Sequence, residues 1–298
     1  MAPRHSALIG PRRARLSLSR NEPVDVLRQK IDQIDAKVVN LLNDRASLAQ
    51  RIGQTKSLSS QEVYVPHREK EILQRVRDLN RGPLSAQAVA AVFREIISGC
   101  RSLEEPLRVA FFGAEATYTH LAAREKFGSS ADLRSTASIP EVFQEVSQGR
   151  ATFGVVPIEN STEGAVTHTF DSLVDSDLQI CAEIYLDIHH NLLSRSGKDA
   201  DVQRIISHPQ ALAQCRGWLA RRFPSIPVDE VASTAHAAMK AAKDGSLAAI
   251  SSAMAKEVYN LQTVAANIED QSNNITRFVV IGKMRTKPSR DDKTSLVF

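Results

Sequence analysis

The sequence predicts a multidomain protein of the α + α/β class, with a helical N-terminal part and a two-lobed α/β part behind it. Two observations support this class. From Val24 to Lys56 apolar residues recur at helical spacing without a proline, and after Pro106 short apolar runs alternate with helical segments. A chain of 298 residues with 42% hydrophobic content can build two domains that each bury a core.

The helical part is predicted to hold three helices. The first is a single helix of 33 residues, Val24–Lys56, which is long for a globular protein. Pro66 opens a second helix that ends near Leu79, and a turn with Gly82 and Pro83 leads to a third, Ser85–Glu104. Three helices in about eighty residues cannot close a deep core alone, so we expect a partner chain and hence a homodimer or higher oligomer.

The α/β part is recognised by short runs of apolar and β-branched residues between helical segments. The runs predicted as strands are Arg108–Phe112, Phe153–Pro157, Gln179–Tyr185, Arg204–Ser207, Ala248–Ser251 and Phe278–Ile281. A segment of this length is one large domain or two small lobes with a cleft between them. The last residues, Thr294–Phe298, read as the start of a further strand.

Charge and hydropathy exclude several classes of partner. Residues 1–20 hold five of the 38 basic residues and none of the 34 acidic ones, so the remainder carries 33 basic against 34 acidic residues. The basic tail is interpreted as a disordered extension or the product of an early start codon, with a transit peptide as the alternative. Because the remainder is about neutral, a nucleic-acid partner is not expected. No apolar run is long enough to cross a bilayer, so a membrane partner is not expected either.

The cysteines and histidines give no sign of a metal or cofactor. Cys100, Cys181 and Cys215 are isolated, which indicates reduced thiols in a cytoplasmic protein. His189 and His190 are adjacent within an apolar stretch and have no flanking ligand cluster, so we read them as part of a half-buried strand.

Three cations on the long helix are candidate ligands for an anion. Arg45 and Lys56 are eleven residues apart and share one face, about 16 Å apart along the axis. Arg28 lies about 25 Å from Arg45, too far for one small ligand to touch both within a chain. If Arg28 serves a site, it serves that of the partner. The alternative is that all three are ordinary solvated helix charges.

The helical part resembles the all-helical class of chorismate mutases over its whole length. The resemblance rests on Val26-Leu27-Arg28, Ile31-Asp32-Gln33-Ile34-Asp35, Leu41-Leu42-Asn43-Asp44-Arg45, Lys56, Tyr64-Val65-Pro66-His67-Arg68-Glu69, Phe93-Arg94-Glu95-Ile96-Ile97 and Ser102-Leu103-Glu104. In that family two chains intertwine and each site takes one arginine from the partner. This is the role that the helix geometry leaves to Arg28.

The chemistry of that family accounts for the residue types. Chorismate carries two carboxylates, and negative charge builds on its ether oxygen as it rearranges, so a catalyst must clamp two anions and place donors at that oxygen. The resemblance implies that Arg28 of the partner and Arg45 hold carboxylates, and that Lys56 and Glu104 face the ether oxygen. Arg68 and Glu69 would orient the ring and its hydroxyl. An ionised carboxylate cannot donate a hydrogen bond, so Glu104 has to be protonated in this role.

Four clusters of hydroxyl and amide side chains stand at strand ends in the α/β part, where loops often bind small polar ligands. They are residues 112–120, 154–164, Ser207-His208-Pro209-Gln210-Ala211-Leu212-Ala213-Gln214-Cys215 and Asn274-Ile275-Thr276-Arg277-Phe278. The alternative for any single cluster is turn and helix-cap chemistry.

Taken together and in this order, the four clusters resemble prephenate dehydratase. The resemblance implies two α/β lobes arranged like a solute-binding protein, with the site in the cleft and no cofactor or metal. It assigns the proton that leaves with the hydroxyl to Thr276, and Arg277 beside it is a candidate carboxylate clamp. The remaining candidates for contact with the substrate are Glu159, Asn160, Ser161, Thr169, Ser207, Gln214 and Phe278. Ala116 stands where relatives have glycine, so that loop is reshaped if a positive φ is needed there.

The expected organisation is a basic tail at 1–20, a chorismate mutase domain at 21–105, a dehydratase domain at 106–285, and a linker with a first regulatory strand at 286–298. In the family a small ACT domain that binds phenylalanine follows, so no phenylalanine site is expected in this chain. Chorismate and prephenate are the expected substrates. Two alternatives remain: a dehydratase whose helices serve only dimerisation, and a sensing module that binds a small molecule without turnover.

Overall fold

The computed structural model describes residues 22–58, 66–104, 107–284 and 293–294. The chain divides into two units, Met1–Ser47 and Leu48–Phe298. The predicted basic tail and residues 295–298 of the predicted last strand lie outside the described residues. Thr294, the first residue of that predicted strand, has no regular secondary structure.

The three predicted helices are confirmed as α1 (Val24–Leu58), α2 (Pro66–Leu79) and α3 (Ala86–Ser102). Ser85 caps α3, because its side chain accepts a hydrogen bond from the backbone N–H of Ala88. Many large apolar side chains of α1 are exposed in the single chain: Val24, Val26, Ile31, Ile34, Val38, Val39, Leu41, Leu48 and Ile52. Such a helix has an apolar surface that the described residues leave exposed.

The first α/β lobe is built on a mixed sheet. Its strand order is β2-β1-β3-β11-β5, and the short strand β4 pairs with β3. Its strands are β1 (Arg108–Phe112), β2 (Asp132–Thr136), β3 (Phe153–Asn160), β4 (Gly164–Ala165), β5 (Gln179–Asp187) and β11 (Ile275–Gly282). Strand β1 runs parallel to β2 and β3, whereas β11 runs antiparallel to β3 and β5.

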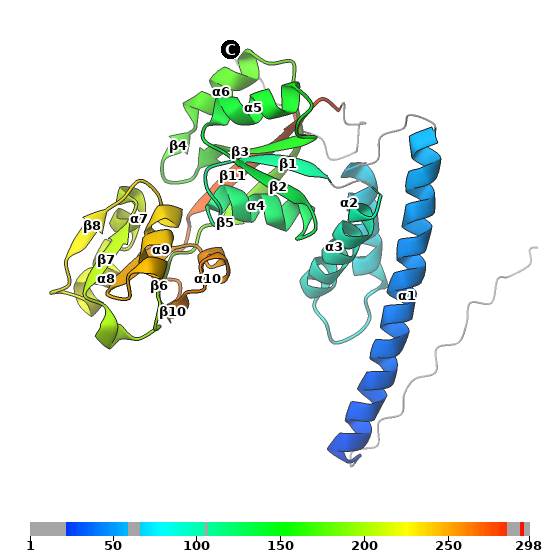
Figure 1. Cartoon of the computed structure of the whole chain (residues 1–298), viewed down its shortest axis with the longest axis horizontal. Helices are drawn as coiled ribbons and strands as arrows, with labels where there is room; N and C mark the ends of the chain where they lie inside the picture. The colour runs from blue at the N-terminus through cyan, green and yellow to red at the C-terminus, as the bar shows by residue number, and fades with distance from the viewer. Residues whose placement is uncertain (1–21, 59–65, 105–106, 285–292, 295–298) are drawn as a thin grey trace, which may run out of the picture. The chain divides into compact units, whose positions relative to one another are not determined.

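Helices cover both faces of this sheet (Figure 1). They are α4 (Tyr118–Phe127), α5 (Ile139–Ser147) and α6 (Thr167–Val174). On the face of α4, Phe111, Phe127 and Phe153 form the centre of a core. On the face of α5 and α6, Val142 and Phe143 pack against the sheet in a second core. Both cores hold the sheet between helices, which fixes the strand ends that carry the polar side chains.

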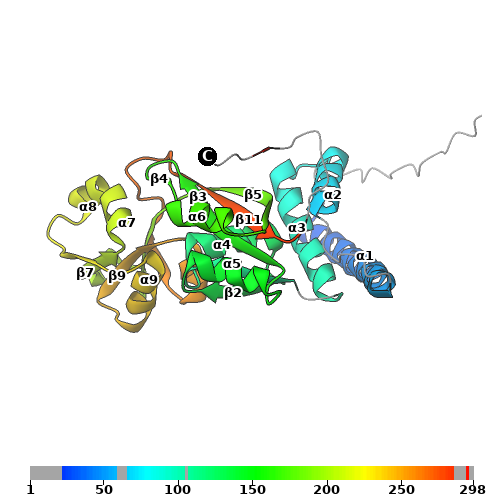
Figure 2. The ribbon, with the colours of Figure 1, turned by 90° about the horizontal axis from the view of Figure 1, so that it is seen from above.

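The second lobe has its own sheet, with strand order β10-β6-β9-β7-β8. Its strands are β6 (Asn191–Ser194), β7 (Arg204–Ser207), β8 (Val228–Glu230), β9 (Leu247–Ser251) and β10 (Gln262–Ala265). Its helices are a 3₁₀ turn (Asp199–Asp201), α7 (Pro209–Gln214), α8 (Arg216–Arg222), α9 (Thr234–Lys243) and α10 (Met254–Val258). The two sheets lie in separate lobes in both views (Figures 1 and 2).

The chain crosses between the lobes twice, once between β5 and β6 and once between β10 and β11. The prediction of two lobes is therefore confirmed. The prediction that His189 and His190 lie in a strand is wrong, because β5 ends at Asp187 and β6 begins at Asn191. An apolar sequence continues through this point, but the chain leaves one sheet here and enters the other.

Candidate active site

Thr276 lies at the start of β11, opposite Asn160 at the end of β3. The side-chain amide of Asn160 donates one hydrogen bond to Thr276 Oγ1 at 2.7 Å and another to Asn274 Oδ1 at 2.8 Å. All three side chains are buried. Because the oxygen of Thr276 accepts from Asn160, its own hydroxyl proton is left to donate to another atom.

The orientation of the Asn160 amide is fixed by its other end. Its Oδ1 accepts from the backbone N–H groups of Thr162 at 2.9 Å and Glu163 at 3.2 Å, and from Thr162 Oγ1 at 2.5 Å. Backbone N–H groups can only donate, so this end must be the oxygen and the other end the NH₂ group. The donor that faces Thr276 therefore follows from the fold.

Gln214 carries the network into the second lobe. It is the last residue of α7, and its Oε1 lies 3.0 Å from Asn274 Nδ2 and 2.7 Å from His190 Nε2. Its Nε2 donates to Thr162 Oγ1 at 3.3 Å. Side chains from both lobes and from the crossover thus form one hydrogen-bonded network, as expected for a site between lobes.

His190 ends this network against Tyr118, the first residue of α4. His190 Nδ1 lies 2.8 Å from the Tyr118 hydroxyl, which is also 2.9 Å from the backbone oxygen of His189. Burial lowers the pKa of His190 and raises the pKa of Tyr118 well above its usual range, so both are neutral near pH 7. Because Gln214 Oε1 only accepts, the single imidazole proton belongs on Nε2 and Nδ1 is an acceptor.

Two acidic residues hold the crossovers in place. Glu269 lies 2.7 Å from His189 Nδ1 and accepts from the backbone N–H of His190 at 2.9 Å. Burial alone would raise the pKa of Glu269, but these hydrogen bonds outweigh burial and lower it. The carboxylate of Asp270 accepts from the N–H groups of Gly217 and Trp218 at the start of α8. These contacts fix the segment that carries Gln214.

Four of the predicted substrate contacts hold the structure around the network. Thr169 and Ser207 are fully buried and donate to the backbone oxygens of Pro157 and Ile250 at 2.6 and 2.7 Å. Ser161 bonds to the backbone of Asn273 and Ile275. Phe278 is 1% exposed and belongs to the core beneath α4. Their hydroxyls and ring are already engaged within the protein.

Arg277 lies on the opposite face of β11 from Thr276, because neighbouring residues of a strand point to opposite faces. It forms ion pairs with Glu159 at 3.5 Å and with Glu183. These carboxylates raise the pKa of Arg277, with the hydrogen bond to Glu183 as the main cause. A guanidinium on the far face with two carboxylate partners argues against the predicted role of Arg277 as a substrate clamp beside Thr276.

The predicted residues of the helical part fall in both units. In the first, Arg28 is exposed and pairs with Asp25 at 3.3 Å, and Arg45 is half-buried on the same helix. In the second, Arg68 pairs with Glu71 at 2.9 Å and is exposed, whereas Glu69 is buried and pairs with Arg101 at 3.4 Å. The backbone of Lys56 belongs to α1, and its side chain lies outside the described residues.

Glu104 lies against the end of α1. A Cβ added to Gly53 would stand 2.8 Å from Glu104 Cγ and 3.0 Å from Glu104 Cβ. Contacts this short show that the backbone of α1 and the stem of Glu104 touch directly. Gly53 is one helical turn before Lys56, so the structure brings Glu104 next to the turn that carries Lys56.

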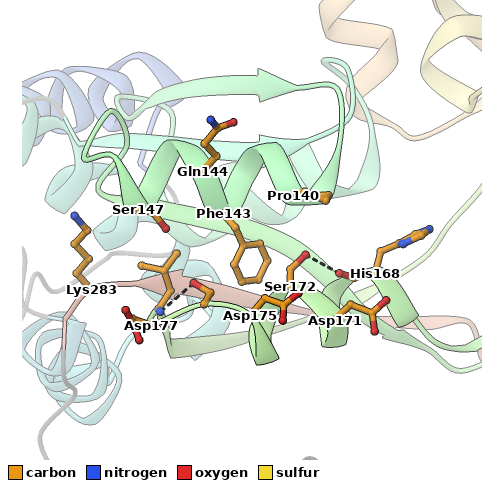
Figure 3. A pocket seen from close by; sticks show the side chains of 12 residues that line it. Pro140, Phe143, Gln144, Ser147, His168, Asp171, Ser172, Asp175, Asp177 and Lys283 are labelled. Carbon is orange, nitrogen blue, oxygen red and sulfur yellow. Dashed lines mark hydrogen bonds between the residues drawn. The ribbon is translucent and has the colours of Figure 1, made fainter.

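A hollow of about 780 Å³ lies away from this network, between α5 and α6 (Figure 3). Figure 3 shows Phe143 and Gln144 of α5 on one side, and Asp171 of α6 with Asp175, the residue after this helix, on the other. None of the predicted site residues lines it. The candidate site is thus defined by its hydrogen-bond chemistry and not by this hollow.

Two kinds of feature are absent from the residues that the structure describes. No helix in this part of the chain is long and apolar enough to cross a membrane. No three side chains of His, Cys, Asp or Glu come together there as a metal site.

Cys215, which ends one of the predicted clusters, is buried, and burial raises the pKa of its thiol to about 12. A thiol of this kind is no nucleophile near neutral pH.

The chain matches two families in succession, chorismate mutase type II over residues 27–105 and prephenate dehydratase over residues 109–286. The bifunctional chorismate mutase/prephenate dehydratase of Aquifex aeolicus is 44% identical over 281 residues, which cover 93% of this chain and 78% of that protein. The chain belongs to the bifunctional chorismate mutase/prephenate dehydratase family.

Two solved structures resemble the α/β part of this family member. Prephenate dehydratase from Arthrobacter aurescens, in complex with L-Phe, matches 61% of this chain and 62% of its own, with a TM-score of 0.57 and 31% identity. GqqA, described as a quorum quenching acylase, matches 63% of this chain and 67% of its own, with a TM-score of 0.54 and 28% identity. Because proteins described by different activities share this fold, the reaction has to be argued from the site.

The chorismate mutase/prephenate dehydratase motifs contain network residues that the sequence did not single out. Tyr118, Thr162 and Asn274 stand within the recognised clusters, but nothing in the sequence says that they bond to predicted residues. His190 was read as part of a strand. The paired histidines at the crossover were the only signal that could have pointed to it.

Proposed function

We propose that this chain catalyses two consecutive reactions, the rearrangement of chorismate to prephenate in its helical part and the conversion of prephenate to phenylpyruvate, CO₂ and water in its α/β part. The two successive family matches support this pair of activities. The observation that carries the second reaction is the hydrogen bond from Asn160 to Thr276, which directs the threonine proton outward.

In the dehydratase step, prephenate loses its ring carboxylate as CO₂ and its ring hydroxyl as water, and the ring becomes aromatic. The electron pair of the breaking carbon–carboxylate bond enters the ring as the carbon–oxygen bond breaks, and the departing oxygen takes up one proton. Donation from the Thr276 hydroxyl stabilises the charge on that oxygen. The hydrogen bond that Thr276 accepts from Asn160 makes its hydroxyl a better donor. The side-chain amides of Asn160 and Asn274 are kept in this orientation by hydrogen bonds that continue to Gln214 and His190.

In the mutase step, no proton needs to move, and the protein clamps the substrate in its reactive conformer. Arg45 and Arg28 of the partner subunit would hold the two carboxylates. Lys56 and a protonated Glu104 would donate to the ether oxygen, and the closeness of Glu104 to Gly53, one helical turn before Lys56, supports this pairing. Arg68 and Glu69 would orient the ring and its hydroxyl.

The oligomer we propose is a homodimer through α1. The exposed apolar side chains of this helix, such as Leu41 at 66% exposed, need a cover that a second copy supplies. The same pairing brings Arg28 of one chain to the site of the other. We place the protein in the cytoplasm, because Cys100, Cys181 and Cys215 are buried free thiols, which is typical of a reducing compartment.

The test is to incubate the purified protein with chorismate, and separately with prephenate, and to quantify chorismate, prephenate and phenylpyruvate over time. We expect phenylpyruvate from both substrates. Consumption of prephenate but not of chorismate would mean that the helices serve only dimerisation. Binding of prephenate in calorimetry without any product would mean a sensing module, and would overturn both proposed activities.

A further inference from the structure

The helical part is docked on the dehydratase part through α3 and the turn that follows α4. Glu95 Oε2 accepts from the backbone N–H of Ser129 at 3.1 Å and from its hydroxyl at 2.6 Å. Gly128, with φ of +80°, lies so close to α3 that an added Cβ would stand 2.4 Å from Ser98 Cβ. This approach leaves no room for a side chain at position 128, so the two parts meet in a specific fit.

Arg101 joins the two parts at this junction. Its Nη1 lies 3.4 Å from Glu69 Oε2, and its Nη2 donates to the backbone oxygen of Phe127 at 2.7 Å. Phe127 is the last residue of α4, and the C-terminal end of a helix favours a cation because its carbonyls point outward there. The planar guanidinium can reach both acceptors at once, which a lysine ammonium cannot do in the same geometry.

The ion pair between Arg101 and Glu69 is shielded from water. Each of the two side chains is only 9% exposed. Lys126 is close by, and burial lowers its pKa, with Glu69 opposing that shift and Arg94, Arg101 and Lys70 adding to it. Glu69 is therefore a negative charge among several buried or half-buried cations. Loss of Arg101 would remove its buried ion-pair partner and the contact that fixes its carboxylate.

We propose that Arg101 is a positioning residue of the mutase site, which holds Glu69 in place and is itself anchored on the dehydratase part through the Phe127 carbonyl. The inference rests on the proposed role of Glu69 in orienting the ring hydroxyl of chorismate. The ion pair uses Oε2, and in this proposal Oε1 is the oxygen that would accept from the ring hydroxyl. The mutase site is thus completed by docking of the helices onto the end of α4.

Helix α4 contacts Arg101 at its C-terminal end and the dehydratase network at its N-terminal end. Tyr118 begins α4 and bonds to His190 in the dehydratase network, whereas Phe127 ends α4 and bonds to Arg101. The Tyr118 end is held independently of Arg101. Loss of Arg101 therefore perturbs the mutase site and leaves the dehydratase site as an internal control within the same chain.

The test compares Arg101→Met, which keeps much of the side-chain length but removes the fork and charge, with Arg101→Lys and with the control Glu95→Gln. The control weakens the same interface without touching Glu69. We expect Arg101→Met to lower mutase kcat/KM about tenfold or more, mainly by raising KM, because Glu69 also contacts the bound substrate before the reaction. Arg101→Lys should recover only part of this loss. Glu95→Gln should keep mutase kcat/KM within about twofold, and every variant should turn over added prephenate within about twofold of wild type.

A double-mutant cycle separates positioning from general destabilisation. In a Glu69→Gln background, Arg101→Met should lower mutase kcat/KM by less than about twofold further, because the residue it positions is already changed. A full additional loss in that background, or an Arg101→Met enzyme that matches Glu95→Gln, would overturn the inference while the proposed function stands. A wild-type enzyme without mutase activity would overturn the proposed function and this inference together.

Discussion

A methyl group added at Gly53 should separate mutase activity from stability. The new Cβ would stand 2.8 Å from Glu104 Cγ, whereas carbon atoms in contact normally lie about 3.5–4.0 Å apart. The new Cβ would meet the root of the Glu104 side chain, with Cβ at 3.0 Å, and also its carboxylate Oε2 at 3.1 Å. Glu104→Gln would leave that root in place, but Gly53→Ala forces it to move by roughly 1 Å.

The two energetic terms of Gly53→Ala oppose each other in the folded chain. Replacing glycine by alanine inside a helix contributes about 1 kcal/mol of stability. Overpacking against Glu104 costs about 1–3 kcal/mol. We therefore expect the free energy of unfolding to fall by no more than about 2 kcal/mol, while a displacement of this size at a catalytic group lowers the mutase rate by about 10- to 100-fold.

Gly99→Ala is the matched control. Gly99 also lies within a helix, but a Cβ there meets only Ser130 Oγ at 3.9 Å, an ordinary contact. It should keep wild-type mutase activity and gain up to about 1 kcal/mol. The assay follows chorismate loss and prephenate turnover separately, with urea unfolding of each variant. A folded Gly53→Ala enzyme with the wild-type mutase rate would show that Glu104 does not act from this position.

Three further predictions concern the partner subunit, the crossover and β11. Arg28→Ala and Arg45→Ala should each be nearly inactive as mutases, but after mixing and reassociation they should recover about a quarter of wild-type activity, because half of the dimers then hold one intact site; no recovery would mean that both arginines serve the same chain. Burial lowers the pKa of His190, so the unfolded chain binds more protons as pH falls through about 6.5 and stability declines; His190→Gln should lose less free energy of unfolding between pH 7 and pH 5 than wild type, and an equal loss in both would refute this. Arg277→Gln should lower the melting temperature while KM for prephenate stays within about twofold, because Arg277 pairs with Glu159 and Glu183; a tenfold rise in KM would support the clamp instead.

The sequence predicted those elements whose pattern is local. Apolar spacing gave all three helices, and the strands Arg108–Phe112 and Arg204–Ser207 have the predicted bounds because their residues are mostly apolar and buried. Strand β2 was not predicted, since its sequence Asp132-Leu133-Arg134-Ser135-Thr136 is polar and it lies at the edge of its sheet. An edge strand has one paired side and little apolar alternation to reveal it.

The loop that begins at Gly113 shows how an alanine can occupy a position with positive φ. Ala116 stands where a glycine was expected and adopts φ of +65° within the core of the second lobe. Its N–H donates to His120 Nδ1 at 3.0 Å, and its carbonyl accepts from Ser252 at 2.8 Å. These contacts hold the strained conformation, which costs about 1–2 kcal/mol for alanine. The sequence showed the possible conflict, and only the tertiary contacts show how it is resolved.

The candidate site was predictable as a set of residue types but not as a network. Thr276, Asn160 and Gln214 were chosen from motifs, and the structure shows them linked through Asn274 and His190. The direction of each hydrogen bond depends on backbone groups of a loop and on burial of an imidazole. Both are properties of the assembled lobes, which no local pattern encodes.

The measurement that tests the central claim most directly is the fate of chorismate in wild type, Thr276→Ala and Thr276→Ser. We predict that wild type yields phenylpyruvate, and that Thr276→Ala consumes chorismate at the wild-type rate but accumulates prephenate. Thr276→Ser, which keeps a hydroxyl that can accept from Asn160, should retain part of the second activity. Formation of phenylpyruvate by Thr276→Ala at the wild-type rate would contradict the assignment of the proton donor and of the site around it.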